Sequence, residues 1–429
     1  MRYFAAVFVM CALTGTVRGQ KTGGPDIIKT DSNPVLRISG EFRPRTEYSH
    51  GYSTLAALEQ KPSFFTSQRT RLNLDFKARG IQTRLVLQDV RLWGSQAQIT
   101  VNEDFAVSVH EAWAEAQLAS YLALRLGRQE LNYDNGRLLG NTAWMQQGRS
   151  HDLALLRFNG FVEAHLGVAW HESGNRKNNF YLGPDAYKFM QFIWISKNFG
   201  KLKVSLTGIN NGIPKNTLNE KGEITAQKTY FTQTVGPWFE FKTGVLSFNG
   251  NAYYQTGKLI NGKDLSAYEY MLEAMWNAAK DLTLGAGYEE LSGTNAEDAT
   301  LKANSFNPMY GTGHKFNGHM DYFYVGNHIG SVGLRDLYCR IGYKIKGITL
   351  GTDLHKFWAA AALPGNPESS LGTELDFYGG YKINEFIEFN AGYSHLLPGP
   401  TMQVLKGGST EATQNWAWVM FTFKPIFLK

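Results

Sequence analysis

The chain has 429 residues, a net charge of +6, 43% apolar residues and a mean hydropathy of −0.30. Beyond the N-terminus there is no run of about 18 apolar residues, which excludes transmembrane helices. The small positive charge gives no reason to expect a nucleic-acid partner. Two classes remain: a soluble secreted protein, and a β-barrel whose alternating strands dilute the hydropathy signal.

The N-terminus has the features of a secretory signal peptide. Arg2 provides a positive charge, residues 3–13 form a mainly apolar stretch, and Val17-Arg18-Gly19 is a small-residue cleavage site. The alternative is that this segment is a buried N-terminal strand or helix. We predict a signal peptide over residues 1–19.

The rest of the chain shows no internal repeat and no low-complexity linker. We therefore predict a short periplasmic segment over residues 20–35 and a single transmembrane β-barrel domain over residues 36–429. Cleavage removes Cys11 and leaves Cys339 as the one cysteine. An intrachain disulfide is therefore not expected.

From Leu36 onward, segments of about ten residues alternate apolar and polar positions, the two-residue period of a strand with two different faces. The alternation is clearest over residues 245–257, 267–278 and 387–396. In the first of these, Leu246 and Phe248 oppose Ser247 and Asn249. The fold class is therefore all-β.

The connections between these segments alternate between short and long. The short ones contain the Gly, Asn and Asp residues that tight hairpin turns need, and they lie at 79–80, 119–120, 159–160, 199–200, 243–244, 279–281, 346–347 and 383–386. The long ones lie near 49–65, 94–105, 131–150, 171–187, 211–228, 258–266, 292–333, 358–370 and 397–413.

This alternation predicts an antiparallel outer-membrane barrel of about 18 strands, with short periplasmic turns, long extracellular loops and both termini in the periplasm. A soluble β-sandwich gives no reason for such asymmetry. Loop 292–333 is too long for a simple connector, so we predict that it folds over or into the pore mouth as a lid.

The apolar face of each strand should contact lipid, because Arg or Lys at mid-bilayer costs about 2–4 kcal/mol. Inward-facing residues are therefore expected as follows: Arg37, Ser39, Glu41, Arg43, Arg45 and Glu47; Arg69, Arg71, Asn73, Asp75 and Lys77; and Glu163, His165, Lys203, Asp336, Arg340, Asp353, His355, Glu374 and Asp376. Cys339 would face lipid. The polar face switches within 82–93 and within 107–117, so we predict a β-bulge in each of these strands.

Thirteen of the eighteen arginines fall between Arg37 and Arg157. One interpretation is that they form cross-strand ion pairs, such as Arg37 with Glu41 or Arg69 with Asp75, and only solvate the wall. The other is a basic track that lowers the barrier for an anion, since guanidinium groups stay charged and hold carboxylates bidentately.

Three segments resemble the alginate export family. The longest runs from Gly127-Arg128-Gln129-Glu130 through Gly136-Arg137 and Trp144 to Gly148-Arg149 and Asp152. A second covers Asn307 to Phe323, and a third is Thr70-Arg71-Leu72. The likeness spans residues 35–425.

The resemblance implies an eighteen-stranded outer-membrane barrel whose basic lumen conducts alginate outward, with periplasmic export components as partners. It places Arg71, Arg128 and Arg157 in the lumen and Arg137 and Arg149 in the external loop between strands five and six. The predicted solute pathway is Arg43, Arg45, Arg69, Arg71, Arg128, Arg137, Arg149 and Arg157, with acidic partners Glu41, Asp75, Glu130 and Asp152.

We therefore predict a bacterial outer-membrane channel, surrounded by lipid, that passes an anionic polysaccharide or oligosaccharide. The alternative is a general diffusion porin for small solutes. Enzymatic activity is not expected, since no Ser lies in a G-x-S-x-G elbow. No cofactor is expected, and His314, His319 and Asp321 in one loop are weak grounds for a metal site.

Overall fold

The structure is a computed structural model, and it describes residues 33–99, 107–172, 181, 187–295, 302–324, 331–363 and 368–429. The predicted signal peptide and most of the predicted periplasmic segment lie outside these ranges. Among the described residues, no helix is long and apolar enough to cross a membrane.

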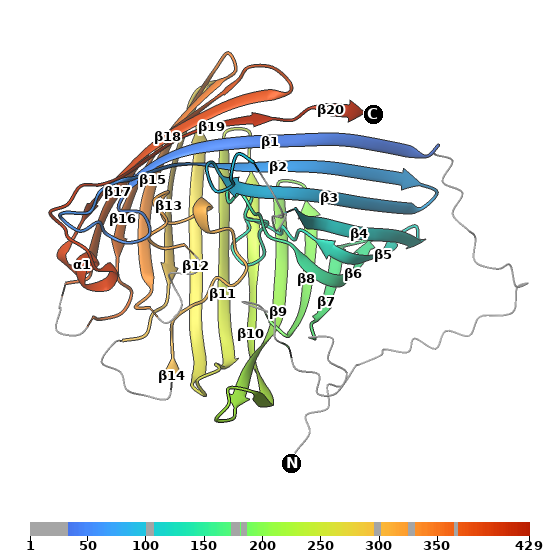
Figure 1. Cartoon of the computed structure of the whole chain (residues 1–429), viewed down its shortest axis with the longest axis horizontal. Helices are drawn as coiled ribbons and strands as arrows, with labels where there is room; N and C mark the ends of the chain where they lie inside the picture. Colours follow the sequence, from blue (N-terminus) through green and yellow to red (C-terminus); the bar gives the residue numbers. More distant parts are fainter. Residues whose placement is uncertain are drawn as a thin grey trace, which may run out of the picture.

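Eighteen long antiparallel strands close into one barrel (Figure 1), which confirms the predicted fold class. The long strands are β1 (Val35–His50), β2 (Ser63–Ala78), β3 (Ile81–Leu92), β4 (Ser108–Ala119), β5 (Leu122–Gln129), β6 (His151–Asn159), β7 (Glu163–Trp170), β8 (Phe189–Phe199), β9 (Leu202–Leu218), β10 (Ile224–Lys242), β11 (Leu246–Lys258), β12 (Asp264–Asn277), β13 (Leu282–Leu291), β15 (Leu334–Ile345), β16 (Ile348–Trp358), β17 (Ser370–Lys382), β18 (Ile387–Pro398) and β19 (Gln414–Phe423). The short elements are β14 (Lys302–Ala303), η1 (Gly313–Lys315), α1 (Pro400–Lys406) and β20 (Ile426–Leu428).

The barrel closes where β1 pairs with β19, in a register that runs from Phe42 opposite Phe423 to His50 opposite Asn415. After β19 the chain turns back, and Leu428 of β20 pairs with Ile38 of β1. Each sheet edge is thereby paired, as a membrane-spanning barrel requires.

All eight short turns lie where the sequence predicts them. At 79–80 and 346–347 both turn residues have positive φ, for example 42° at Arg79 and 80° at Gly80, as tight hairpins with right-handed twist need. Because the short turns mark the periplasmic end, the ends of the strands that carry the long connections are extracellular.

Two of the predicted long loops are shorter than expected. Residues 211–218 pair with residues 224–232, with one register shift between Ile224 and Ala226, so β9 and β10 continue as a ribbon and only 219–223 form the loop. Likewise β11 and β12 stay paired up to Lys258 and Asp264. The predicted extents of the loops at 211–228 and 258–266 are therefore wrong. The strands continue there as polar ribbons beyond the bilayer, where no apolar face is required.

Of the two predicted β-bulges, one is confirmed and one is wrong. Neighbouring Val86 and Leu87 of β3 pair with Glu111 and Val109 of β4, which leaves His110 as an extra residue. Both His110 and Glu111 are buried. In contrast, β3 keeps an unbroken register with β2. Asp89 and Arg91 of β3 share the outward face of Leu85, near the extracellular rim.

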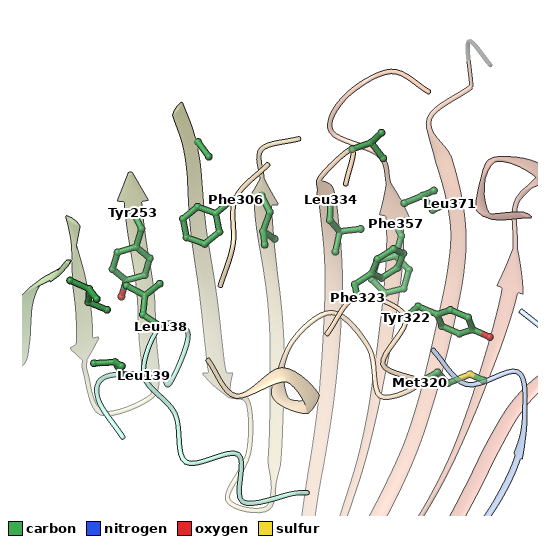
Figure 2. Packing of buried hydrophobic residues seen from close by; sticks show 14 of the residues in the cluster. Leu138, Leu139, Tyr253, Phe306, Met320, Tyr322, Phe323, Leu334, Phe357 and Leu371 are labelled. Carbon is green, nitrogen blue, oxygen red and sulfur yellow. The ribbon is translucent and has the colours of Figure 1, made fainter. Parts of the chain in front are cut away.

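The hydrophobic core lies inside the barrel. Figure 2 shows Phe306, Met320, Tyr322 and Phe323, from the connection between β13 and β15, beside Leu334, Phe357 and Leu371 of the wall. Leu138 and Leu139, from the connection between β5 and β6, lie near Tyr253 of β11. The described part of loop 292–333 therefore folds into the barrel, as predicted.

Candidate functional site

Two segments fold into the lumen and contact each other. We name them loop A (residues 130–150, between β5 and β6) and loop B (residues 302–324, between β13 and β15). Gly140 N–H donates to Tyr310 O at 2.9 Å, and Tyr310 N–H donates to Leu138 O at 3.2 Å. Thr312 N–H donates to Gly136 O at 2.8 Å. The two longer segments that carried the family resemblance thus form one unit inside the barrel.

Arginines of β1 hold loop A from one side. Arg43 donates to Gln146 Oε1 at 3.0 Å and to the carbonyl oxygens of Ala143, Trp144 and Met145 at 2.8–3.1 Å. Arg45 donates to Trp144 O at 2.8 Å and to Glu47 Oε1 at 2.8 Å. Both arginines are buried, so their hydrogen-bonding capacity is directed at the loop rather than at solvent.

Arginines of β2 bind the same loop. Arg69 forms an ion pair with Glu41 and also lies 3.4 Å from the carbonyl oxygens of Met145 and Gln146. Arg71 donates to Gln88 Oε1 at 2.7 Å and to Gln147 O at 3.4 Å, and it lies 3.6 Å from Glu130. We call Arg43, Arg45, Arg69 and Arg71 the arginine wall.

Glu130 and Arg149 mark the two ends of loop A. Burial alone would raise the pKa of the Glu130 carboxyl, but hydrogen bonds with His110 and Asn141 and the charge of Arg71 bring it below its usual value. Arg149 donates to Gly311 O of loop B at 2.9 Å, so it links the two loops inside the lumen. The predicted pair of Arg69 with Asp75 is also not formed, since Asp75 pairs with Arg84.

The opposite wall carries inward-facing carboxylates, and Arg137 of loop A reaches it. Arg137 Nε lies 2.8 Å from Glu289 Oε1 of β13 and 4.0 Å from Glu269 Oε1 of β12. It is 2% exposed, and it also donates to Asn317 Oδ1 of loop B at 3.1 Å. Loop A therefore spans the lumen from the arginine wall to the carboxylates.

Loop B is held by further inward-facing carboxylates. We call Glu269, Glu289, Asp336 and Glu374 together the carboxylate wall. Met320 N–H donates to Glu374 Oε1 at 2.8 Å, and the Asn317 amide donates to Asp336 Oδ2 at 3.2 Å. Gly318 has φ of +82°, and a Cβ there would lie 2.6 Å from Glu374 Oε1, so the approach requires glycine.

A stack of rings links the two walls. The Arg45 guanidinium lies 4.1 Å from the ring centroid of Trp144, which stacks on His314 at 4.2 Å and 10°. His314 stacks on His319 at 5.1 Å. Burial lowers the pKa of His319 to about 4, although the Asp376 carboxylate lies 4.0 Å away. A metal site at His314, His319 and Asp321 is not supported, since no group of three side chains that could hold a metal ion occurs among the described residues.

A second set of charged residues stays accessible on the inner wall. Arg84 pairs with Asp75 at 2.7 Å and with Glu111, and its side chain is 34% exposed. Arg125 and Arg157 share Glu115, at 2.9 and 2.8 Å. We call Arg84, Arg125 and Arg157 the arginine ledge; the predicted pathway contained only Arg157. Strand alternation would have indicated Arg84 and Arg125, which the family motifs do not cover.

The structure contradicts the predicted lumen position of Arg128 and Asp152. On β5, Arg128 shares the outward face of Leu126, which is 51% exposed. On β6, Asp152 shares the face of Leu156, opposite the buried Leu153 and Leu155. The two side chains form an ion pair at 2.9 Å near the extracellular rim. Cys339, in contrast, is exposed on the outward face as predicted.

No protein-family model matches the chain, and no curated protein matches it. Among solved structures it is similar to Pseudomonas aeruginosa OccK11 (OpdR), with a TM-score of 0.59 and 11% identity over 92% of this chain and 96% of that one. It is also similar to P. aeruginosa OccK3 (OpdO), with a TM-score of 0.61, 11% identity and 91% and 96% coverage. Acinetobacter baumannii OccAB1 gives a TM-score of 0.59, 11% identity and 92% and 97% coverage.

These relatives are outer-membrane Occ and Opd porins. The comparison supports the barrel and porin part of the family resemblance, and it gives no support to alginate export. The chain has the closed antiparallel barrel fold of these proteins, which is consistent with a place in the bacterial outer membrane.

Proposed function

We propose that the chain is an outer-membrane channel for small solutes, with a preference for small anions. The observation that carries this proposal is the pair of inner loops, each held by charged residues of the wall. It favours the diffusion-porin alternative over passage of a polysaccharide, and it assigns no catalysis to the chain.

The size limit follows from how the loops are anchored. A polymer would need loop A to leave the lumen, which breaks the contacts of Arg43 with loop carbonyls and of Arg137 with Glu289. A buried charge that is left without its partner costs about 3–5 kcal/mol. We expect small solutes to pass without such movement. A uronate monosaccharide is the form of the alginate-like cargo that we expect this lumen to admit.

Room for a solute exists on the extracellular side of the loops. A cavity of about 770 Å³ lies between the ends of β1–β3 and loops A and B, where Arg45, Tyr52, Trp144 and Asp321 are among its lining residues. This volume falls in the range of sites for small molecules, about 300–1,000 Å³. The cavity thus provides an entrance vestibule for a sugar-sized solute.

The anion preference rests on the arginine ledge. Arg84 and Arg157 each have side chains that are 34% exposed, whereas their partners Glu111 and Glu115 are 9% and 7% exposed. Glu111 and Glu115 are therefore less accessible to a solute than these guanidinium groups, whereas Asp75, the second partner of Arg84, is 35% exposed. Charged side chains that line a pore select ions by sign.

Reversal potentials in planar bilayers under a salt gradient test this selectivity. We expect the wild type to prefer anions and the Arg84→Gln/Arg157→Gln variant to lose most of that preference. Arg128→Gln is the matched control, because it removes an arginine on the outer face. A cation-preferring wild type, or a preference that is unchanged in the double variant, contradicts the proposal.

A further inference from the structure

A polar cluster lies on the outward face of the barrel at the extracellular ends of β12, β13, β15 and β16. The strand pairing places one residue of each strand in a single row across the wall: Tyr270, Glu290, Arg335 and Trp358. Lys356 lies opposite Leu337, one outward position below this row. These strands enter the long connections at this end, so the cluster lies at the rim that faces the outer leaflet.

Glu290 is held by tyrosines although it is on the lipid-facing side. Tyr268 and Tyr270 donate their hydroxyls to it at 3.0 Å, and Tyr288 donates at 2.7 Å. Glu290 is 7% exposed. Three hydroxyl donors compensate for most of the hydration that the carboxylate loses, which is why an acidic residue is tolerated here.

Arg335 is oriented by Glu290 but is not saturated by it. Its Nε lies 3.3 Å from Glu290 Oε2, and its side chain is 43% exposed. Within the described part of the chain, no other acceptor contacts its guanidinium group. Lys356 uses one donor on Ser370 Oγ, at 3.1 Å. Diagonal neighbours on adjacent strands lie close enough for long side chains to act together.

The surface below the cluster is apolar. Three leucines continue this face on β12, β15 and β16 and are 46–55% exposed: Leu272, Leu337 and Leu354. Ile341 of β15, which is 48% exposed, continues the same face toward the periplasm. Tyr343 of β15 follows it, 41% exposed, at the periplasmic side. The site therefore combines two cations at the headgroup level with a hydrocarbon-compatible surface beneath them.

We propose that Arg335 and Lys356 bind the phosphate of a phosphorylated glycolipid of the outer leaflet, whose acyl chains lie along the leucine surface. Guanidinium groups recognise phosphate bidentately, and ammonium groups bind it as point charges. Aromatic residues at the interface, here Tyr268, Tyr270 and Trp358, accompany such headgroups. The site is on the outside of the barrel and is independent of solute passage.

Native mass spectrometry of the full chain in detergent, with diphosphorylated lipid A added, tests the proposal. We expect a bound lipid on the wild type, with at least about tenfold weaker binding for Arg335→Gln/Lys356→Gln, a loss of about 1.4 kcal/mol or more, because the variant lacks both cations that hold the phosphate. Lys197→Gln is the matched control, because Lys197 lies outward at the periplasmic end of β8. Its binding should equal that of the wild type.

A second arm uses the wild type alone and needs no variant to fold. Lipid A without phosphates should bind about tenfold more weakly than the diphosphorylated form if phosphate is the recognised group. Equal binding of the two lipids overturns the proposal, as does unchanged binding in the double variant. Phosphatidylglycerol binding as tightly as lipid A also overturns it, since the proposed ligand is the glycolipid.

Discussion

The two walls of the lumen use opposite charges for the same task. The arginine wall holds loop A mainly through backbone carbonyls, which are neutral acceptors available wherever the loop passes. The carboxylate wall holds the loops through two side chains, Arg137 and Asn317, and through the backbone N–H of Met320. The first arrangement tolerates sequence change in the loop, whereas the second depends more strongly on single side chains.

The comparison also shows why counting charges overstates how basic the lumen is. Arg43, Arg45 and Arg69 are buried against loop A, and Glu269, Asp336 and Glu374 are buried against loop B and its neighbours. In the proposed channel, the charges that a solute meets are mainly those of the arginine ledge. Selectivity would then be carried by other residues than most of those that anchor the loops.

The largest effect is expected at the carboxylate wall. Arg137→Met leaves Glu289 and Glu269 without their cation, and loss of one partner of a buried pair costs about 3–5 kcal/mol. We expect both loops to leave the lumen and single-channel conductance to rise with frequent gating. Arg137→Lys is the control and should retain part of the anchoring. Wild-type conductance in Arg137→Met would contradict the dependence on a single side chain.

A smaller effect is expected at the arginine wall. Arg43→Gln removes donors to three backbone carbonyls, but Arg45 and Arg69 still contact the same segment. We expect a cost of about 1–3 kcal/mol, the range for a buried acceptor left without its donor. Protease accessibility of loop A measures it, with less exposure than in Arg137→Met. If loop A were as exposed or more exposed in Arg43→Gln than in Arg137→Met, this ranking of the two walls would be contradicted.

The docking of loop B should weaken in acid. His319 has a pKa of about 4 when docked, below its ordinary value of about 6.5. Between these values the released loop binds more protons, so stability is complete above about pH 6.5 and falls as the pH drops toward 4, by at most about 1.4 kcal/mol per unit. Conductance at pH 7 and pH 5 measures this, and His319→Gln should flatten the difference. An unchanged pH response in that variant excludes His319 as its origin.

The smallest effect is expected outside the lumen. Arg128 and Asp152 form a largely exposed pair on the outer face, where such pairs contribute about 0–1 kcal/mol. Arg128→Gln should leave both conductance and ion selectivity at wild-type values in the same bilayers. A loss of anion preference would return Arg128 to the solute pathway.

Most of the barrel was predictable because its signals are local. Alternation over about ten residues and the Gly, Asn and Asp turns set the strands, their faces and the eighteen-strand count. The β9–β10 ribbon was missed because its residues 211–218 lie beyond the bilayer, where no apolar face is required. The bulge at His110 was visible as a switch of the polar face.

The site was predictable only in part. Alternation placed Arg43 and Arg69 inward, but their partners in loop A lie 103 and 76 positions along the chain, which no local pattern reveals. Arg128 is different, because Leu122, Leu124 and Leu126 precede it at the same two-residue spacing. That spacing indicates the lipid-facing side, in contrast to the lumen position that the family resemblance implies.

Liposome swelling with uronates of increasing length tests the central claim, that two loops anchored on opposite walls limit the lumen to small solutes. For the wild type we predict rapid entry of glucuronate and exclusion of a hexameric oligouronate. The Arg43→Gln/Arg137→Met variant should admit both. Entry of the hexamer into wild-type liposomes at the rate of the monosaccharide would contradict the account.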